Sequence, residues 1–135
     1  MLEFRIASGS VVPIYKQLVD QVRWAVVTGA LGIGEPLPSV RVVAEQLVVN
    51  PNTVAKAYAE LASEGVIESR AGKGSFVAAR RQVFSKTERS RRLEEALNAF
   101  VNEAAYLGFA PDDIRTILER RLAQLPKPPK GDRHS

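Results

Sequence analysis

Two helix-start signals lie close together in the middle of this chain, and their spacing strongly constrains the fold. Ser39 is a good N-cap for one helix, and Asn50 followed by Pro51 is a good N-cap and first residue for the next. Between them, apolar residues at helical spacing fit a helix of about two turns. Val48 and Val49 then leave room for only a tight connection. Two short helices joined by such a turn predict a helix-turn-helix.

The second of these helices has the clearest pattern in the chain. Its apolar positions follow helical spacing, and Gly65 is placed to end it. The apolar face comprises Val54, Ala57, Tyr58 and Leu61, and the opposite side holds Asn52, Thr53, Ala55, Lys56 and Ala59. Residues on that opposite side are short or flexible, and only Lys56 among them is charged. A face of this kind suits close approach to another surface.

Elements on both sides complete the N-terminal half. Residues 1–12 form a short arm, an amphipathic helix follows Pro13 and ends at Gly29, and residues 30–38 form a loop. Beyond Gly65 the apolar period changes to two. The segments 66–70 and 75–78 predict a β-hairpin with Lys73 at its tip, anchored by Ile67, Phe76 and Val77. A hairpin after a helix-turn-helix is the wing of a winged helix.

The C-terminal half predicts two further helices. The first begins at Ser85 with a capping box completed by Glu88 and continues to Gly108. The second begins at Pro111, where Phe109 and Ile114 are spaced as a hydrophobic staple. The fold class is therefore mainly α with a small β-hairpin. We expect a winged helix-turn-helix domain over 11–79, a helical dimerisation region over 80–125 and a disordered tail over 126–135.

Composition excludes most enzymes. The chain has no Cys, and its only His, His134, lies in the tail, so a catalytic triad, a His general base or a His- or Cys-based metal site is not expected. We predict a protein that is not an enzyme and needs no cofactor or metal. No apolar run is long enough for a membrane span or a secretory signal, so we expect a cytoplasmic protein without a membrane partner.

The net charge of +4 comes from the C-terminal half, because residues 1–79 carry equal numbers of basic and acidic side chains. A short stretch there holds many cations and only one anion, Glu88. Its basic residues are Arg80, Arg81, Lys86, Arg89, Arg91 and Arg92. Such a stretch favours a polyanion as partner, although a solvated linker and helix start would have the same composition.

The second helix of the helix-turn-helix is suited to binding double-stranded DNA. In the major groove, Asn52 is suited to adenine, Thr53 to a base or a phosphate, Lys56 to guanine or a phosphate, and Ala55 to a thymine methyl. Arg41 is placed to reach the DNA backbone, and Lys73 a neighbouring groove or phosphate. Simpler roles remain open: Ser39 and Asn50 as caps only, and Arg41 and Lys56 as solvated charges. Tyr58 and Trp24 are expected in the core, since both lie on or beside apolar stripes.

Residues 11–78 resemble the winged helix-turn-helix of bacterial GntR-family transcription regulators. The resemblance rests on PIYKQL, G-x-L-x-x-G-x-x-LPS-x-R, VNPNTV, AY-x-EL-x-x-EG and GKG-x-FV. The short C-terminal region is similar to that of the YtrA-like subfamily, where it serves dimerisation. The resemblance implies DNA contacts from Ser39, Arg41, Asn50, Asn52, Thr53, Lys56, Gly72, Lys73 and Gly74. Two departures stand out: many relatives carry Arg at the positions of Pro51 and Ala55, and Val48-Val49 replaces a more usual Leu/Gly-Val turn.

A homodimer also follows from the apolar stripes of the two C-terminal helices, which make a poor core by themselves. Pairing with a second copy would bury both stripes and present two recognition helices to an inverted repeat. We therefore expect a sequence-specific regulator, a repressor by family habit. The alternative is a winged-helix module for protein interaction or DNA architecture. A groove between subunits could hold a small-molecule effector, but the sequence does not support one.

Overall fold

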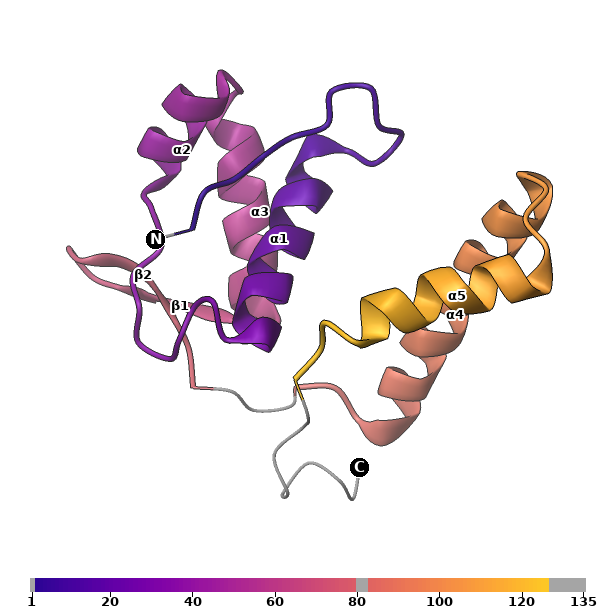
Figure 1. The fold of residues 1–135 in the computed structure, drawn as a ribbon. Coiled ribbons are helices and arrows are strands. Elements are labelled where there is room, and N and C mark those ends of the chain that lie inside the picture. Colours follow the sequence, from indigo (N-terminus) through magenta and orange to yellow (C-terminus); the bar gives the residue numbers. More distant parts are fainter. Residues whose placement is uncertain (1, 80–82, 127–135) are drawn as a thin grey trace. The chain divides into compact units, whose positions relative to one another are not determined.

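The computed structural model describes residues 2–79 and 83–126 of the 135-residue protein. These residues fall in two compact units, which divide between Val83 and Phe84. The elements in chain order are α1 Ile14–Thr28, α2 Val40–Leu47, α3 Pro51–Ser63, β1 Ile67–Arg70, β2 Gly74–Val77, α4 Lys86–Tyr106 and α5 Pro111–Leu122 (Figure 1). The mainly helical fold class with one hairpin is therefore confirmed. The basic pair Arg80 and Arg81, and the predicted tail from residue 127 on, lie outside the described residues.

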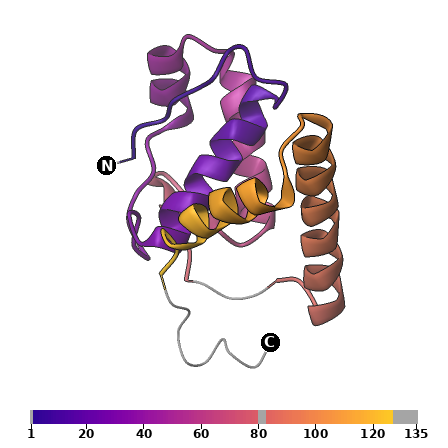
Figure 2. The ribbon, with the colours of Figure 1, turned by 45° about the vertical axis from the view of Figure 1, so that its right-hand side comes forward.

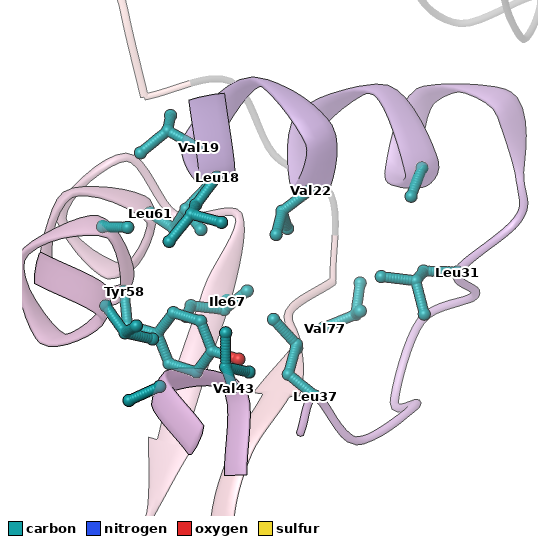
Figure 3. Close-up of a cluster of buried hydrophobic side chains, with 14 residues drawn as sticks. Leu18, Val19, Val22, Leu31, Leu37, Val43, Tyr58, Leu61, Ile67 and Val77 are labelled. Atoms are coloured by element: carbon teal, nitrogen blue, oxygen red, sulfur yellow. The ribbon is translucent and has the colours of Figure 1, made fainter. Parts of the chain in front are cut away.

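The first unit is built around a core shared by three helices and the hairpin (Figure 3). Each helix contributes one apolar face, as the sequence period predicts. The largest fully buried side chains are Leu18, Val19, Val22, Val43, Val54, Leu61 and Val77. Trp24 is half-buried on α1, and Tyr58 is buried on α3. The core therefore fixes the orientation of α3 relative to α1 and α2.

The helix-turn-helix forms with the predicted caps. The Ser39 hydroxyl accepts from the amide of Val42 at 3.1 Å, and the Asn50 side chain accepts from the amide of Asn52 at 2.8 Å. Val48 closes α2 in the left-handed region, with φ 54° and ψ 51°. A β-branched residue rarely adopts this conformation, so the turn is strained at Val48.

The hairpin is antiparallel and pairs Ile67 with Val77 and Glu68 with Phe76. Ile67 and Val77 are buried, which confirms both as anchors. The prediction for Phe76 was wrong: successive strand residues point to opposite faces, so Phe76 faces away from Val77 and is only half-buried. The loop between α1 and α2 forms hydrogen bonds with the free edge of β2. The amide of Leu37 donates to Ser75 and that of Val77 to Glu35, both at 2.9 Å.

The N-terminal arm lies on the first unit, running from beside α2 to the start of α1 (Figures 1 and 2). Two glutamines of α1 hold its backbone. Gln21 accepts from the Arg5 amide at 3.0 Å and donates to the Arg5 carbonyl at 2.5 Å. Gln17 exchanges the same pair of bonds with Ala7, at 2.8 and 3.2 Å. The two glutamine side chains thus satisfy backbone groups of the arm that a neighbouring strand would bond in a sheet.

The second unit consists of α4 and α5, which diverge from a short turn (Figure 2). Ser85 caps α4 by accepting from the amide of Glu88 at 3.1 Å. The reciprocal half of the predicted capping box is not seen, because the Glu88 carboxylate binds Arg91 and Arg92 instead. Phe109 and Ile114 line one small hollow, in agreement with the staple. Among the described residues of this unit, only Ala104 is buried.

Candidate nucleic-acid interface

The outward face of α3 is open to solvent in the first unit. Asn52, Ala55, Lys56 and Ala59 are all exposed, and they lie opposite the buried face of the helix. Thr53 is half-buried. Apart from Lys56, the side chains of this face are short, as suits a helix that enters a groove about 12 Å wide.

The two cap residues stand at the start of α2 and of α3, and both are exposed. In each cap, the side-chain oxygen accepts one hydrogen bond from a backbone amide. The Ser39 hydroxyl proton and the Asn50 side-chain NH₂ make no hydrogen bond in the described part of the chain. Both groups can therefore donate to an anion while the caps remain formed.

Arg41 lies on the outer face of α2. Its guanidinium Nε is 3.3 Å from the Glu45 carboxylate, and its side chain is 89% exposed. A surface pair of this type contributes about 0–1 kcal/mol. The guanidinium can therefore leave Glu45 for a phosphate at little cost.

Lys56 extends from α3 toward α1. Its ammonium lies 3.9 Å from the centre of the Tyr15 ring, in cation–π geometry. Tyr15 is half-buried near the start of α1. The only cation of α3 is thus held at the side of the helix that faces α1.

A row of ion pairs continues along the contact between α1 and α3. Lys16 lies 3.8 Å from both Asp20 and Glu60, and Arg23 binds Glu64 through Nε at 3.0 Å. Burial alone would lower the pKa of Arg23, but its hydrogen bond to Glu64 and the nearby carboxylates raise it. The guanidinium is therefore always charged and fixes α3 against α1.

The wing tip is a tight turn that requires glycine. Gly72 and Gly74 have φ of 71° and 100°, in a region that L side chains rarely adopt. Lys73 between them is exposed. Arg70 stacks over the Phe76 ring at 4.2 Å. Because Gly74 is opposite Arg70 in the register, no side chain separates the guanidinium from that ring.

Comparison with known proteins agrees with this geometry. The pattern of bacterial regulatory proteins of the gntR family matches residues 14–77. The chain is 35% identical to the HTH-type transcriptional regulator YhcF of Bacillus subtilis (strain 168), over 76% of this chain and 84% of YhcF. It is 31% identical to the HTH-type transcriptional repressor YtrA of the same organism, over 89% of this chain and 92% of YtrA. The chain belongs to the GntR family.

Two solved structures match this chain beyond the winged helix. A transcriptional antiterminator from Listeria monocytogenes EGD-e is 34% identical with a TM-score of 0.76, covering 89% of this chain and 90% of the other. YtrA from Sulfolobus acidocaldarius, described as a GntR-family transcription factor, is 31% identical with a TM-score of 0.56. That match covers 76% of this chain and 97% of the other. The expected YtrA-like membership is confirmed.

Membership in the GntR family makes this protein a DNA-binding transcription regulator and places it in a non-enzymatic class. Among the residues that the structure describes, no cluster of His, Asp or Glu could hold a metal ion. None of the described helices is long and apolar enough to span a membrane.

Most predicted contact residues of this GntR protein lie on the helix-turn-helix. Ser39 and Arg41 lie at the start of α2, and Asn50 to Lys56 lie at the start of α3, directly after the tight turn. Gly72 to Gly74 lie apart from them, at the tip of the hairpin (Figure 1). Sequence reasoning missed Tyr15 and Arg70. Arg70 could have been identified from the sequence, because Arg70 and Phe76 occupy diagonal positions on the two strands of the predicted hairpin. Tyr15 could not, because its contact with Lys56 depends on how α1 packs on α3.

Proposed function

We propose that this GntR-family protein is a repressor that binds an inverted-repeat operator as a homodimer in the cytoplasm. DNA contacts would come from Ser39, Arg41, Asn50, Asn52, Thr53, Lys56, Gly72, Lys73 and Gly74. The observation that carries the proposal is the outward face of α3, which is exposed, short in side chains and begun by a cap with spare donors. A protein-interaction module would favour a bulky apolar or acidic face there, so this rival has less support.

Apolar exposure in the second unit supports the homodimer. On α4, Leu93, Leu97 and Val101 are 70%, 44% and 42% exposed and lie on one stripe. On α5, Ile117 and Leu122 are 40% and 51% exposed. Monomeric proteins rarely expose a continuous apolar surface of this kind. A second copy of the same unit would cover it by self-complementary packing, which a two-fold axis requires.

A two-fold symmetric dimer would fit an operator that is an inverted repeat, in both the orientation and the spacing of its half-sites. Each copy would carry one α3, and the axis would relate the two helices by a half-turn. Duplex DNA repeats about every 10 base pairs, so half-sites would be spaced by that distance or a multiple of it. Repression is supported by YtrA, which is named a transcriptional repressor. Binding at an operator would then exclude other proteins from the same DNA.

Sedimentation and salt titration test the proposal together. We expect a dimer at micromolar concentration, with or without DNA. If the dimer contacts six to ten phosphates, the logarithm of affinity should fall with the logarithm of salt at a slope of about −5 to −9. A monomer under both conditions would contradict the dimer. No binding to any duplex at low salt would contradict the DNA-binding surface.

A further inference from the structure

Along the α1–α3 contact, Lys16 and Arg23 are paired with carboxylates and Lys56 is not. Glu60 lies four residues after Lys56, the spacing at which a helical ion pair normally forms. Its carboxylate is instead near Lys16 at 3.8 Å and Arg23 at 3.9 Å. Within residues 2–79 and 83–126, no carboxylate is within ion-pair distance of the Lys56 ammonium. Lys56 is therefore the cation of this contact that remains available to an external anion.

The Tyr15 ring decides where that cation lies. It draws the ammonium from the outward face of α3 to the side next to α1, at 3.9 Å from the ring centre. A cation–π contact leaves the far side of the ammonium in solvent, and Lys56 is exposed. The Tyr15 ring therefore holds the Lys56 ammonium in place, and the ammonium can still donate a hydrogen bond to a ligand.

The position beside α1 matches phosphate rather than base. A helix with its side chains is 10–12 Å wide and fills a major groove about 12 Å wide. The centre of the inserted face then meets base edges, and its sides meet the sugar–phosphate backbone. Asn52 and Ala55 remain on the outward face, and the Asn52 side chain makes no hydrogen bond in the described chain.

We propose that Tyr15 positions Lys56 on a phosphate of the DNA backbone, so that α3 reads bases without its lysine. This proposal rests on the proposed DNA-binding function and settles the choice between guanine and phosphate that the sequence leaves open. Tyr15 is thus a positioning residue of the interface, and sequence preference under α3 comes from Asn52 and the small side chains beside it.

Titration of two duplexes tests the assignment of Lys56. One duplex is selected by the wild-type protein from a random pool, and the other is a scrambled duplex of the same composition. Lys56→Met should weaken binding to both by the same factor and reduce the salt slope by about one per subunit. The ratio of the two affinities should change less than twofold. Lys16→Met is the matched control, since Lys16 is already paired, and it should leave the slope unchanged.

The role of Tyr15 is tested by coupling. Tyr15→Leu should weaken binding to both duplexes about twofold to fivefold, the range of an exposed cation–π contact. The same change should have no effect in the Lys56→Met background, and Tyr15→Phe, which keeps the ring, should bind as the wild type does. Thermal melting checks that each variant folds. If Tyr15→Leu does not fold, a ring-current shift of the Lys56 ε-methylene protons in the wild type tests the contact directly.

Opposite results would overturn the proposal in recognisable ways. A tenfold or larger loss of discrimination at one base pair in Lys56→Met, with scrambled binding unchanged, would make Lys56 a base reader. Equal weakening by Tyr15→Leu in both backgrounds, or absence of the ring-current shift, would make Tyr15 merely structural. In each case the wild type still binds DNA, so the proposed function stands. Failure of the wild type to bind either duplex would overturn both.

Discussion

The hydroxyl of Tyr58 donates to the backbone carbonyl of Pro38 at 2.5 Å. This bond ties the middle of α3 to the residue before the Ser39 cap of α2. Both Tyr58 and Pro38 are buried, and burial raises the pKa of Tyr58, so its hydroxyl stays protonated as a donor. This hydrogen bond therefore adds to the core in holding the start of α2 against the middle of α3.

Removal of this hydroxyl should destabilise the first unit. Tyr58→Phe leaves the buried Pro38 carbonyl without its partner, and such a loss costs about 1–3 kcal/mol. Urea unfolding of the full chain measures the change. Tyr106→Phe is the matched control, because Tyr106 is 87% exposed, and it should unfold as the wild type does. Equal midpoints for the two variants would contradict a structural role of the Tyr58 bond.

Replacement of Val48 should stabilise the helix-turn-helix. Val48 has φ 54° and is 89% exposed, so it is strained and contributes little packing. Strain of this kind costs about 1–3 kcal/mol, and glycine loses about 0.5–1 kcal/mol in chain entropy. Val48→Gly should therefore raise the free energy of unfolding, by up to about 2.5 kcal/mol. Val11, also exposed but not in the left-handed region, is the control: Val11→Gly should not stabilise. A less stable Val48→Gly protein would contradict the strain.

Hydrogen exchange should detect the glutamine contacts of the arm one at a time. Gln21→Leu removes the acceptor of the Arg5 amide, and Gln17→Leu removes that of Ala7. Each bond is worth about 1 kcal/mol, so protection should fall about fivefold at the amide concerned. Each variant serves as control for the other. Unchanged exchange at both amides would show that the arm is held by its apolar side chains alone.

Glu88 should make the second unit sensitive to acid. Hydrogen bonds from Arg91 and then Arg92 lower the pKa of Glu88 from 4.5 to about 2. A carboxylate with a lowered pKa stabilises the folded state above its unfolded value, so this contribution is lost as pH falls from about 4.5 toward 2. Thermal unfolding of wild type and Glu88→Gln should therefore differ at pH 6 and converge near pH 2.

The control for this titration is Glu94→Gln on the same helix. Glu94 takes part in no ion pair among the described residues, so its replacement should not change the acid sensitivity. A constant difference between wild type and Glu88→Gln from pH 6 to pH 2 would contradict the role of the arginines.

Local chemistry explains which parts of the fold could be predicted. Ser39 and Asn50 are of residue types that favour the N-cap position, and Gly29 ends α1 in the left-handed conformation, with φ 84°. The start and end of a helix depend on such nearby residues. The element order followed from these signals, and the resemblance to the GntR family followed from that order and its motifs.

Competition between neighbours explains what could not be predicted. Phe76 and Val77 are adjacent and both apolar, so only the register with Ile67 decides which one faces the core. Glu88 had two possible partners, its own cap amide or the guanidinium groups of Arg91 and Arg92, and the charged groups prevailed. The nine predicted contact residues stay predictions until DNA binding is measured.

Selection of duplexes from a random pool tests the central claim most directly. The account predicts enrichment of a two-fold symmetric site whose half-sites are separated by about 10 base pairs or a multiple of it. Asn52→Ala should select a site that has lost its preference at one base pair in each half, with the spacing unchanged. A pool with no enriched sequence at low salt, or an Asn52→Ala selection identical to that of the wild type, would contradict the reading of DNA by the outward face of α3.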